Sequence, residues 1–98
     1  MYQQKPSKMR RHRKGDVMFN GGFKHFINHD KVLAAVDFSA KSQPIIRAIN
    51  NAKDMGMLID ITMGRKTNTV IFTETGHVIL SHSISETIAK RIKEAKNA

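Results

Sequence analysis

The chain has 98 residues, of which 17 are Lys or Arg and 8 are Asp or Glu, and it contains no cysteine. This length suits one domain, and the missing cysteines exclude a disulfide framework, a Cys-based metal site and a thiol nucleophile. The net charge of +9 favours a polyanionic partner such as nucleic acid. Because the sequence has no long apolar run, we expect a cytoplasmic protein with neither a signal peptide nor a membrane partner.

The start of the chain differs in composition from the rest. Six cations stand there against the single acid Asp16: Lys5, Lys8, Arg10, Arg11, Arg13 and Lys14. With one proline and almost no β-branched or aromatic residue, this segment cannot bury enough apolar surface to fold alone. We therefore predict a disordered arm over residues 1–16, making nonspecific phosphate contacts, and a folded domain over residues 17–98. A solubilising extension, or a start codon upstream of the true one, is the alternative.

An α+β domain is predicted behind this arm. Apolar residues around Gly21-Gly22 predict a first strand with a bulge or bend, and residues 32–38 predict a second strand. A helix follows, because Ser42 can serve as its N-cap, Pro44 suits the first turn, and Gly56 can end it. The apolar face at helical spacing consists of Ile45, Ile49 and Ala52.

Residues 57–62 and 69–73 are two β-prone segments that flank a glycine followed by Arg65 and Lys66. This pattern predicts a hairpin whose tip holds the two cations at one edge of a sheet. Side chains on a rigid scaffold lose less entropy when they bind a polyanion, so this pair is the best candidate for a specific contact. An ordinary solvated turn is the alternative. Asp60, on the first segment, is expected to be partly buried and paired, in a structural role.

The C-terminal part predicts a second hairpin and a last helix. Residues 69–74 and 77–81 are β-prone and are joined by a turn at Thr75-Gly76. Residues 83–86 form an S-x-x-E capping box, and the helix behind it has an apolar stripe suited to a core or a subunit interface. The stripe consists of Ile84, Ile88, Ile92 and Ala95. The fold class is therefore α+β, a small antiparallel sheet of about five strands with two helices.

The sequence contains no catalytic constellation. Gly64-Arg-Lys-Thr67 is like the end of a P-loop, but an arginine precedes the lysine and a strand rather than a helix follows. His25 and His29 have the spacing of helical metal ligands, yet their glycine-rich and β-like flanks oppose a helix. His77 and His82 should point to opposite faces of a strand. We therefore expect no enzyme activity, no metal, no cofactor and no small-molecule ligand.

Five short motifs occur in a characteristic order. They are Pro44-Ile-Ile-Arg47, Gly56-Met-Leu-Ile-Asp60, Gly64-Arg-Lys-Thr67, Gly76-His-Val-Ile-Leu-Ser81 and Glu86-Thr87. From about Val17 to Ile92 the chain resembles the RemA family of bacterial extracellular-matrix regulators. The resemblance implies a DNA-binding transcription regulator that activates matrix or stress genes and binds repetitive AT-biased regions upstream of promoters. It also implies an octamer-like ring homo-oligomer and a fold similar to LytTR DNA-binding domains.

The resemblance implies DNA-contacting positions as well. They fall on Lys31, just before the second predicted strand, and on Arg65 and Lys66. Lys31 replaces the arginine usual in the family, which keeps a phosphate contact possible but removes a planar fork for bidentate contacts. Residues 1–16 have no counterpart in the family, and the loop over residues 37–43 is longer than usual, which could change the ring size.

Two functions remain open at this stage. One is a ring-forming regulator that binds double-stranded DNA. The other is a small basic RNA-associated or nucleoid-structural protein without promoter specificity. Because both predict salt-sensitive binding, only a comparison of specific DNA, random DNA and RNA separates them.

Overall fold

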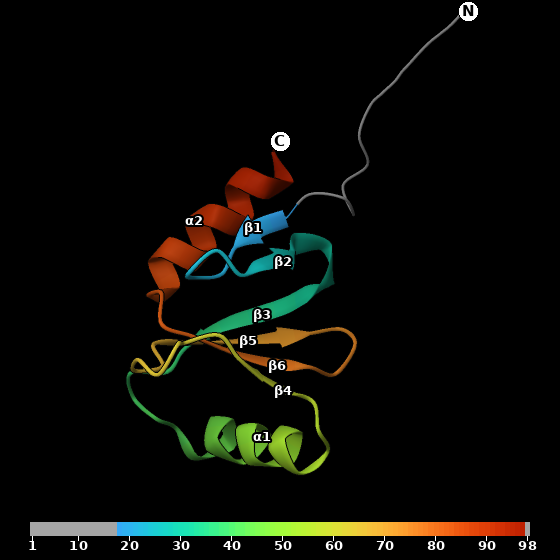
Figure 1. Cartoon of the computed structure of the whole chain (residues 1–98), viewed down its shortest axis with the longest axis vertical. Coiled ribbons are helices and arrows are strands. Elements are labelled where there is room, and N and C mark those ends of the chain that lie inside the picture. Colours follow the sequence, from blue (N-terminus) through green and yellow to red (C-terminus); the bar gives the residue numbers. More distant parts are fainter. Residues whose placement is uncertain (1–17, 98) are drawn as a thin grey trace, which may run out of the picture.

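The computed structural model describes residues 18–97, so the arm predicted over residues 1–16 lies outside the described residues. The described chain contains two α-helices, one short 3-10 helix and six strands (Figure 1). In chain order they are β1 (Met18–Asn20), β2 (Phe26–Asn28), η3 (His29–Lys31), β3 (Val32–Asp37), α1 (Gln43–Asp54), β4 (Leu58–Asp60), β5 (Thr69–Thr73), β6 (Val78–Ser81) and α2 (Ser85–Lys96).

The strands form two sheets. β1 and β2 pair as a two-stranded antiparallel sheet, and the larger sheet has the strand order β3-β5-β6-β4. In the larger sheet β4 pairs parallel to β6, while the other neighbours are antiparallel. The α+β class with two helices is therefore confirmed. The expected single antiparallel sheet of about five strands is instead a mixed four-stranded sheet beside a two-stranded one.

The larger sheet is covered on both faces. Figure 1 shows α1 on one side of it, and α2 with the β1–β2 sheet on the other. Along the central strand β5, Ile71 packs toward α2 beside Ile88, while Val70 packs toward α1 beside Ala52. This alternation follows from the two-residue period of a strand, and coverage of both faces explains why β5 is buried along almost its whole length.

The first helix forms as the sequence predicts. Ser42 occupies the N-cap position of α1, although its side chain makes no capping hydrogen bond, and Pro44 lies in the first turn. Ile45 and Ile49 pack with Ala52 on the cluster under the sheet. The predicted second strand and the hairpin of β5 and β6 are also confirmed.

The hairpin predicted between residues 57–62 and 69–73 is wrong. β4 pairs with β6, not with β5, so residues 61–68 cross the end of β6 to reach β5. The physical reason is that β5 already uses both of its edges, one for β3 and one for β6. Arg65 and Lys66 therefore lie on a crossover loop rather than on a hairpin tip.

Gly21 and Gly22 form the turn of a hairpin, not a bulge within one strand. They follow β1, and the chain returns as β2 in antiparallel register. A Cβ atom on Gly21 would lie 2.5 Å from Cδ1 of Ile27, and Gly22 has a φ of +129°. Both positions therefore favour glycine. The bulge of this fold lies elsewhere, at Leu33 in β3, where the register with β5 shifts.

The predicted capping box of the last helix is also wrong. α2 begins at Ser85 with Ile84 as its N-cap residue, and no side chain caps it. Ser83 therefore lies one residue before the N-cap position, where its backbone N–H donates to the hydroxyl of Ser81 and its carbonyl accepts from the hydroxyl of Thr69. In the stripe, Ile88 and Ala95 are buried and Ile92 packs against them, whereas Ile84 is 54% exposed. No helix of the described residues is long and apolar enough to cross a membrane.

Candidate nucleic-acid interface

Three loops meet at one end of the larger sheet, at the left in Figure 1. In the strand register Asp37 pairs with Thr69, which pairs with Ser81, so the end of β3, the start of β5 and the end of β6 share this end. The loops are residues 21–25, residues 38–42 and residues 61–68. We call this end of the molecule the loop edge.

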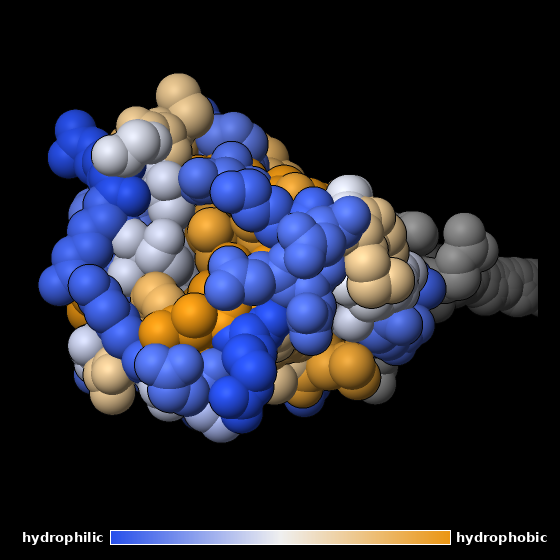
Figure 2. All heavy atoms as spheres, turned by 90° about the horizontal axis from the view of Figure 1, so that it is seen from below, coloured by the Kyte–Doolittle hydropathy of each residue, from blue (hydrophilic) through white to orange (hydrophobic). Residues whose placement is uncertain are grey.

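The loop edge carries four exposed cations and few acids. The cations are Lys24, Lys41, Arg65 and Lys66, at least one from each loop. From below, hydrophilic side chains line this end of the molecule, at the left in Figure 2, beside a recess in which apolar atoms show. The two nearby acids, Asp37 and Asp60, are each engaged within their own loop. The four positive charges outnumber the two negative ones, which favours an anionic partner.

A local network shapes the Arg65-Lys66 loop. Oδ1 of Asp60 accepts from the hydroxyl of Thr62 at 2.6 Å and from its backbone N–H at 2.9 Å. These two hydrogen bonds, the hydroxyl first, lower the pKa of Asp60 below its ordinary value of 3.8. The backbone N–H of Arg65 then donates to the carbonyl of Thr62. The turn uses Gly64 at a φ of +80°, where glycine has no steric penalty.

Two aromatic rings support the cationic pair from the neighbouring loop and strand. The guanidinium carbon of Arg65 lies 5.6 Å from the centre of the Phe23 ring, within cation–π range. The ring of His82 stacks on Phe23 with 6.0 Å between centroids. Nδ1 of His82 lies 3.0 Å from the carbonyl of Lys66 and donates to it, because a carbonyl oxygen can only accept. The side chain of Asn68 donates to the carbonyl of His82.

Backbone strain among the described residues is concentrated at this end of the sheet. The non-glycine residues with a left-handed φ are Phe23, Lys24, Lys41 and Met63, and each belongs to one of the three loops. Such conformations cost on the order of 1–2 kcal/mol per residue and persist only where the surroundings hold them. Strain of this kind gathers at functional sites, so its location supports the loop edge as the site.

Lys31 lies at the other end of the sheet. It precedes Val32, which pairs with Thr73, whereas Arg65 precedes the opposite end of β5 at Thr69. The ends of β5 are about 13 Å apart at ~3.3 Å per residue, so one subunit does not bring Lys31 and Arg65 together. Instead, Nζ of Lys31 pairs with Oε1 of Glu74 at 3.4 Å, with both side chains about half exposed.

The other residues that sequence analysis considered have structural surroundings. His25 donates through Nδ1 to the carbonyl of Gly22, and His77 shares a hydrogen bond with Thr75. His29 is buried in the 3-10 helix. Within residues 18–97, no group of three or more His, Cys, Asp or Glu residues could hold a metal ion. Asp60 is paired as predicted, but it is exposed rather than partly buried.

Sequence reasoning missed Phe23, Lys24, Lys41 and His82 as members of the site. Each is ordinary in sequence, and only the folded arrangement brings them to Arg65 and Lys66. The positive φ angles of the four non-glycine residues could not be predicted from the sequence. The Gly21-Gly22 pair was the one available signal, because it marks a loop built to a fixed shape.

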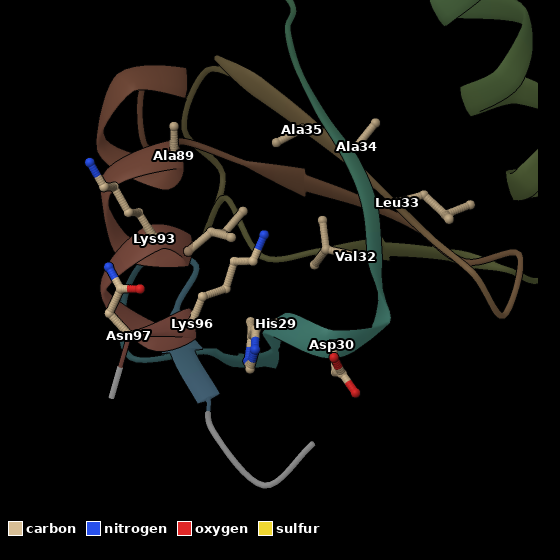
Figure 3. Close-up of a pocket in the computed structure, with 11 residues that line it drawn as sticks. His29, Asp30, Val32, Leu33, Ala34, Ala35, Ala89, Lys93, Lys96 and Asn97 are labelled. Carbon is tan, nitrogen blue, oxygen red and sulfur yellow. The ribbon is translucent and has the colours of Figure 1, made fainter. Parts of the chain in front are cut away.

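A groove of about 670 Å³ lies away from the loop edge, between β3 and α2. Figure 3 shows Val32 and Ala35 on β3 facing it, while Lys96 reaches across it from α2. Leu33, at the bulge, is 70% exposed, and β3 pairs on one side only within the described residues. A free strand edge with exposed apolar side chains favours contact with another chain.

Fold and site together define a small α+β domain that displays clustered cations at one end of its sheet. Residues 18–92 match the family model RemA-like, described as extracellular matrix regulatory protein A-like. The chain therefore belongs to the RemA-like family.

Named relatives agree with this family. The chain is 42% identical over 80 residues to a "Putative regulatory protein" of Synechococcus elongatus, which covers 82% of this chain and 90% of the relative. A protein of the same name from Desulforamulus reducens is 46% identical over 80 residues, covering 80% of this chain and 87% of the relative. Another, from Pseudothermotoga lettingae, is 44% identical over 78 residues, covering 80% and 84%. The chain thus belongs to a family with a regulatory role.

Proposed function

We propose that this protein is a transcription regulator that binds double-stranded DNA through the loop edge. Arg65 and Lys66 contact backbone phosphates, and the regulated genes are matrix or stress genes, as the family resemblance implies. The observation that carries the proposal is the placement of two exposed cations on an ordered loop, beside Lys24 and Lys41, in a protein with net charge +9.

Pre-organisation of the loop gives the proposal its physical basis. The backbone of residues 61–68 is tied by Asp60, Thr62 and His82, so the backbone that carries the two cations loses little entropy on binding. Arginine can hold a phosphate through two parallel N–H donors, whereas lysine acts as a point charge. Each neutralised phosphate also releases condensed counterions, which makes binding strongly dependent on salt.

Self-association is the second part of the proposal. We infer that a second copy covers the free edge of β3 and the adjoining groove, because Leu33 is exposed there and β4 leaves another free edge with Ile59 42% exposed. A contact between two different surfaces of identical chains closes into a ring when the rotation permits. A domain this small gains useful apolar burial from such contacts.

A ring also gives Lys31 a place in the function. Because Lys31 and Arg65 lie at opposite ends of one sheet, they reach the same DNA segment only if the assembly places Lys31 of one copy near Arg65 of another, or if the DNA runs along the whole subunit. Repetition of a few contacts around a ring multiplies affinity through avidity. The arm over residues 1–16 would add phosphate contacts that do not depend on sequence.

The test compares three nucleic acids at one salt concentration. The protein is titrated into labelled DNA from the region upstream of its candidate target genes, into random DNA of equal length, and into RNA. Tighter binding to the upstream DNA, lost in the Arg65→Ala/Lys66→Ala variant, supports the regulator. Equal affinity for all three contradicts it and favours an RNA-associated or nucleoid-structural protein.

A further inference from the structure

We propose that the β1–β2 loop is a second DNA-contacting element, in which the Phe23 ring orients the Arg65 guanidinium and Lys24 binds a neighbouring phosphate. This inference rests on the proposed DNA-binding function and deepens it. It assigns Phe23 and His82 as positioning residues and Lys24 as a binding residue.

The loop that carries Phe23 and Lys24 is held in one shape. Oδ1 of Asn20 accepts from the backbone N–H groups of Gly22 at 2.8 Å and of Lys24 at 3.1 Å. The hydroxyl of Ser81 donates to the carbonyl of Gly21, and Arg91 donates to the carbonyl of Asn20 at 2.8 Å. These bonds fix the loop to both β6 and α2. The loop is therefore rigid enough to hold the Arg65 side chain in one orientation.

Phe23 exposes a large apolar ring to solvent, which is unfavourable unless the ring contacts another group. Its side chain is 45% exposed, and its φ is +51°, a conformation unfavourable for a bulky residue. One contact of the ring is with His82 and another is with the Arg65 guanidinium. A ring braced in this way restricts the guanidinium and leaves its N–H edges able to donate to a phosphate.

His82 links the same ring to the second cation. Because its Nδ1 donates to the carbonyl of Lys66, the stacked pair of rings is tied to the backbone of the Arg65-Lys66 loop. Movement of the β1–β2 loop would thus disturb both cations of the pair. The two loops therefore act as one surface.

Lys24 follows Phe23 directly, so its backbone lies beside the Arg65 contact. Its side chain is exposed and makes no ion pair with a described residue, unlike Lys31, which pairs with Glu74. The acids at this end of the sheet, Asp37 and Asp60, accept from Ser39 and Thr62 in their own loops. Lys24 is therefore free to meet a phosphate next to the one that Arg65 contacts.

The first test compares two single substitutions, each of which removes one positive charge. Lys24→Ala is compared with Lys53→Ala, which removes an exposed lysine near the end of α1. We expect Lys24→Ala to weaken DNA binding and to reduce the slope of log K against log salt by about 0.9 for each subunit that contacts DNA. We expect Lys53→Ala to change neither. Equal effects of the two substitutions would overturn the assignment of Lys24.

The second test is a double-mutant cycle between Phe23 and Arg65. Phe23→Leu should weaken DNA binding several-fold in the parent and have a clearly smaller effect on the Arg65→Ala variant, while Phe23→Tyr should bind as the parent does. A loss of the same factor in both backgrounds would overturn the positioning role. His82→Ala gives a second route to the same cycle if Phe23→Leu lowers the melting temperature.

The DNA affinities from both tests are compared with that of the Arg65→Ala/Lys66→Ala variant. If that double variant binds DNA as the parent does, the proposed function fails. If it loses binding while Lys24→Ala and Phe23→Leu do not, only the inference about the β1–β2 loop fails.

Discussion

Lys31 and Glu74 form an ion pair, with 3.4 Å between Nζ and Oε1, at the end of the sheet opposite to Arg65. Both side chains are about half exposed, and such surface pairs contribute only about 0–1 kcal/mol. Under the proposed function, DNA would therefore compete with Glu74 for Lys31. The pair nevertheless keeps part of the positive charge of Lys31 neutralised while the protein is free.

Substitutions of Lys31 and of Glu74 should have modest and opposite effects on DNA affinity. Lys31→Ala should weaken DNA binding less than Arg65→Ala, because Lys31 must first leave Glu74. Glu74→Gln removes the competing carboxylate and should strengthen binding about two- to threefold, an effect that fades at high salt. Fluorescence anisotropy at two salt concentrations measures both. Weaker binding by Glu74→Gln would show that Lys31 needs its partner and does not contact DNA directly.

Acid should weaken the native state through Asp60. Hydrogen bonds from Thr62 lower its folded pKa below the ordinary value of 3.8, so the carboxylate adds stability above about pH 3.8 and loses it as the pH falls through the lowered pKa. Asp60→Asn should therefore be less stable than the parent at pH 6, with a difference that shrinks below pH 3.8. Urea unfolding at several pH values tests this. A difference that does not change with pH would mean that the charge of Asp60 is unimportant.

Gly21→Ala should destabilise the fold and loosen the β1–β2 loop. The added Cβ would meet Cδ1 of Ile27 at 2.5 Å and Cδ1 of Ile61 at 3.1 Å. Crowding of this kind in a packed core costs about 1–3 kcal/mol. Gly64→Ala is the control, because no atom lies within 4 Å of its added Cβ, although its φ of +80° carries strain. Thermal melting measures both, and an unchanged melting temperature in Gly21→Ala would contradict the close packing described for the loop.

Leu33→Asp should weaken self-association without unfolding the subunit. Leu33 is 70% exposed at the free edge of β3, and a buried aspartate without a partner is unfavourable in an interface. Ile84→Asp, at another exposed apolar residue, is the control and should assemble as the parent does. Light scattering gives the mass of each. Equal masses for Leu33→Asp and the parent would place the subunit contact elsewhere.

Removal of residues 1–14 should weaken binding to every DNA sequence by a similar factor. The segment contributes six cations, and each lost phosphate contact flattens the slope of log K against log salt by about 0.9. Preference for specific DNA should survive. A truncated protein that no longer distinguishes upstream DNA from random DNA would show that Arg10, Arg11 or Arg13 reads a groove.

Local signals in the sequence were sufficient for some elements. α1 forms where Pro44 and the Ile45, Ile49 and Ala52 face predict it, and the β5–β6 hairpin turns at Thr75-Gly76. These features depend on residues that are close in sequence. The Arg65-Lys66 pair could be identified as a candidate for the same reason, since its glycine and its two charges are adjacent.

The remaining features depend on pairing between distant segments. β4 pairs with β6 rather than with β5 because β3 and β6 already occupy the two edges of β5. The contact between Phe23 and Arg65 arises only when the β1–β2 sheet packs on the larger sheet. No local pattern could predict either. The S-x-x-E pattern at residues 83–86 failed because α2 begins one residue later than the box requires, with Ile84 rather than Ser83 as its N-cap residue.

The most direct test of the loop edge as the DNA-binding surface is the salt-dependent affinity of Arg65→Ala/Lys66→Ala for upstream DNA. The matched control is Arg47→Ala/Lys53→Ala, which removes one arginine and one lysine from the exposed face of α1. We expect the first variant to lose affinity on the order of tenfold or more, and its slope against log salt to fall by about 1.8 per contacting subunit, with its melting temperature unchanged. The control should bind nearly as the parent does. Parental affinity in the first variant, or an equal loss in both, would contradict a DNA-binding surface at the loop edge.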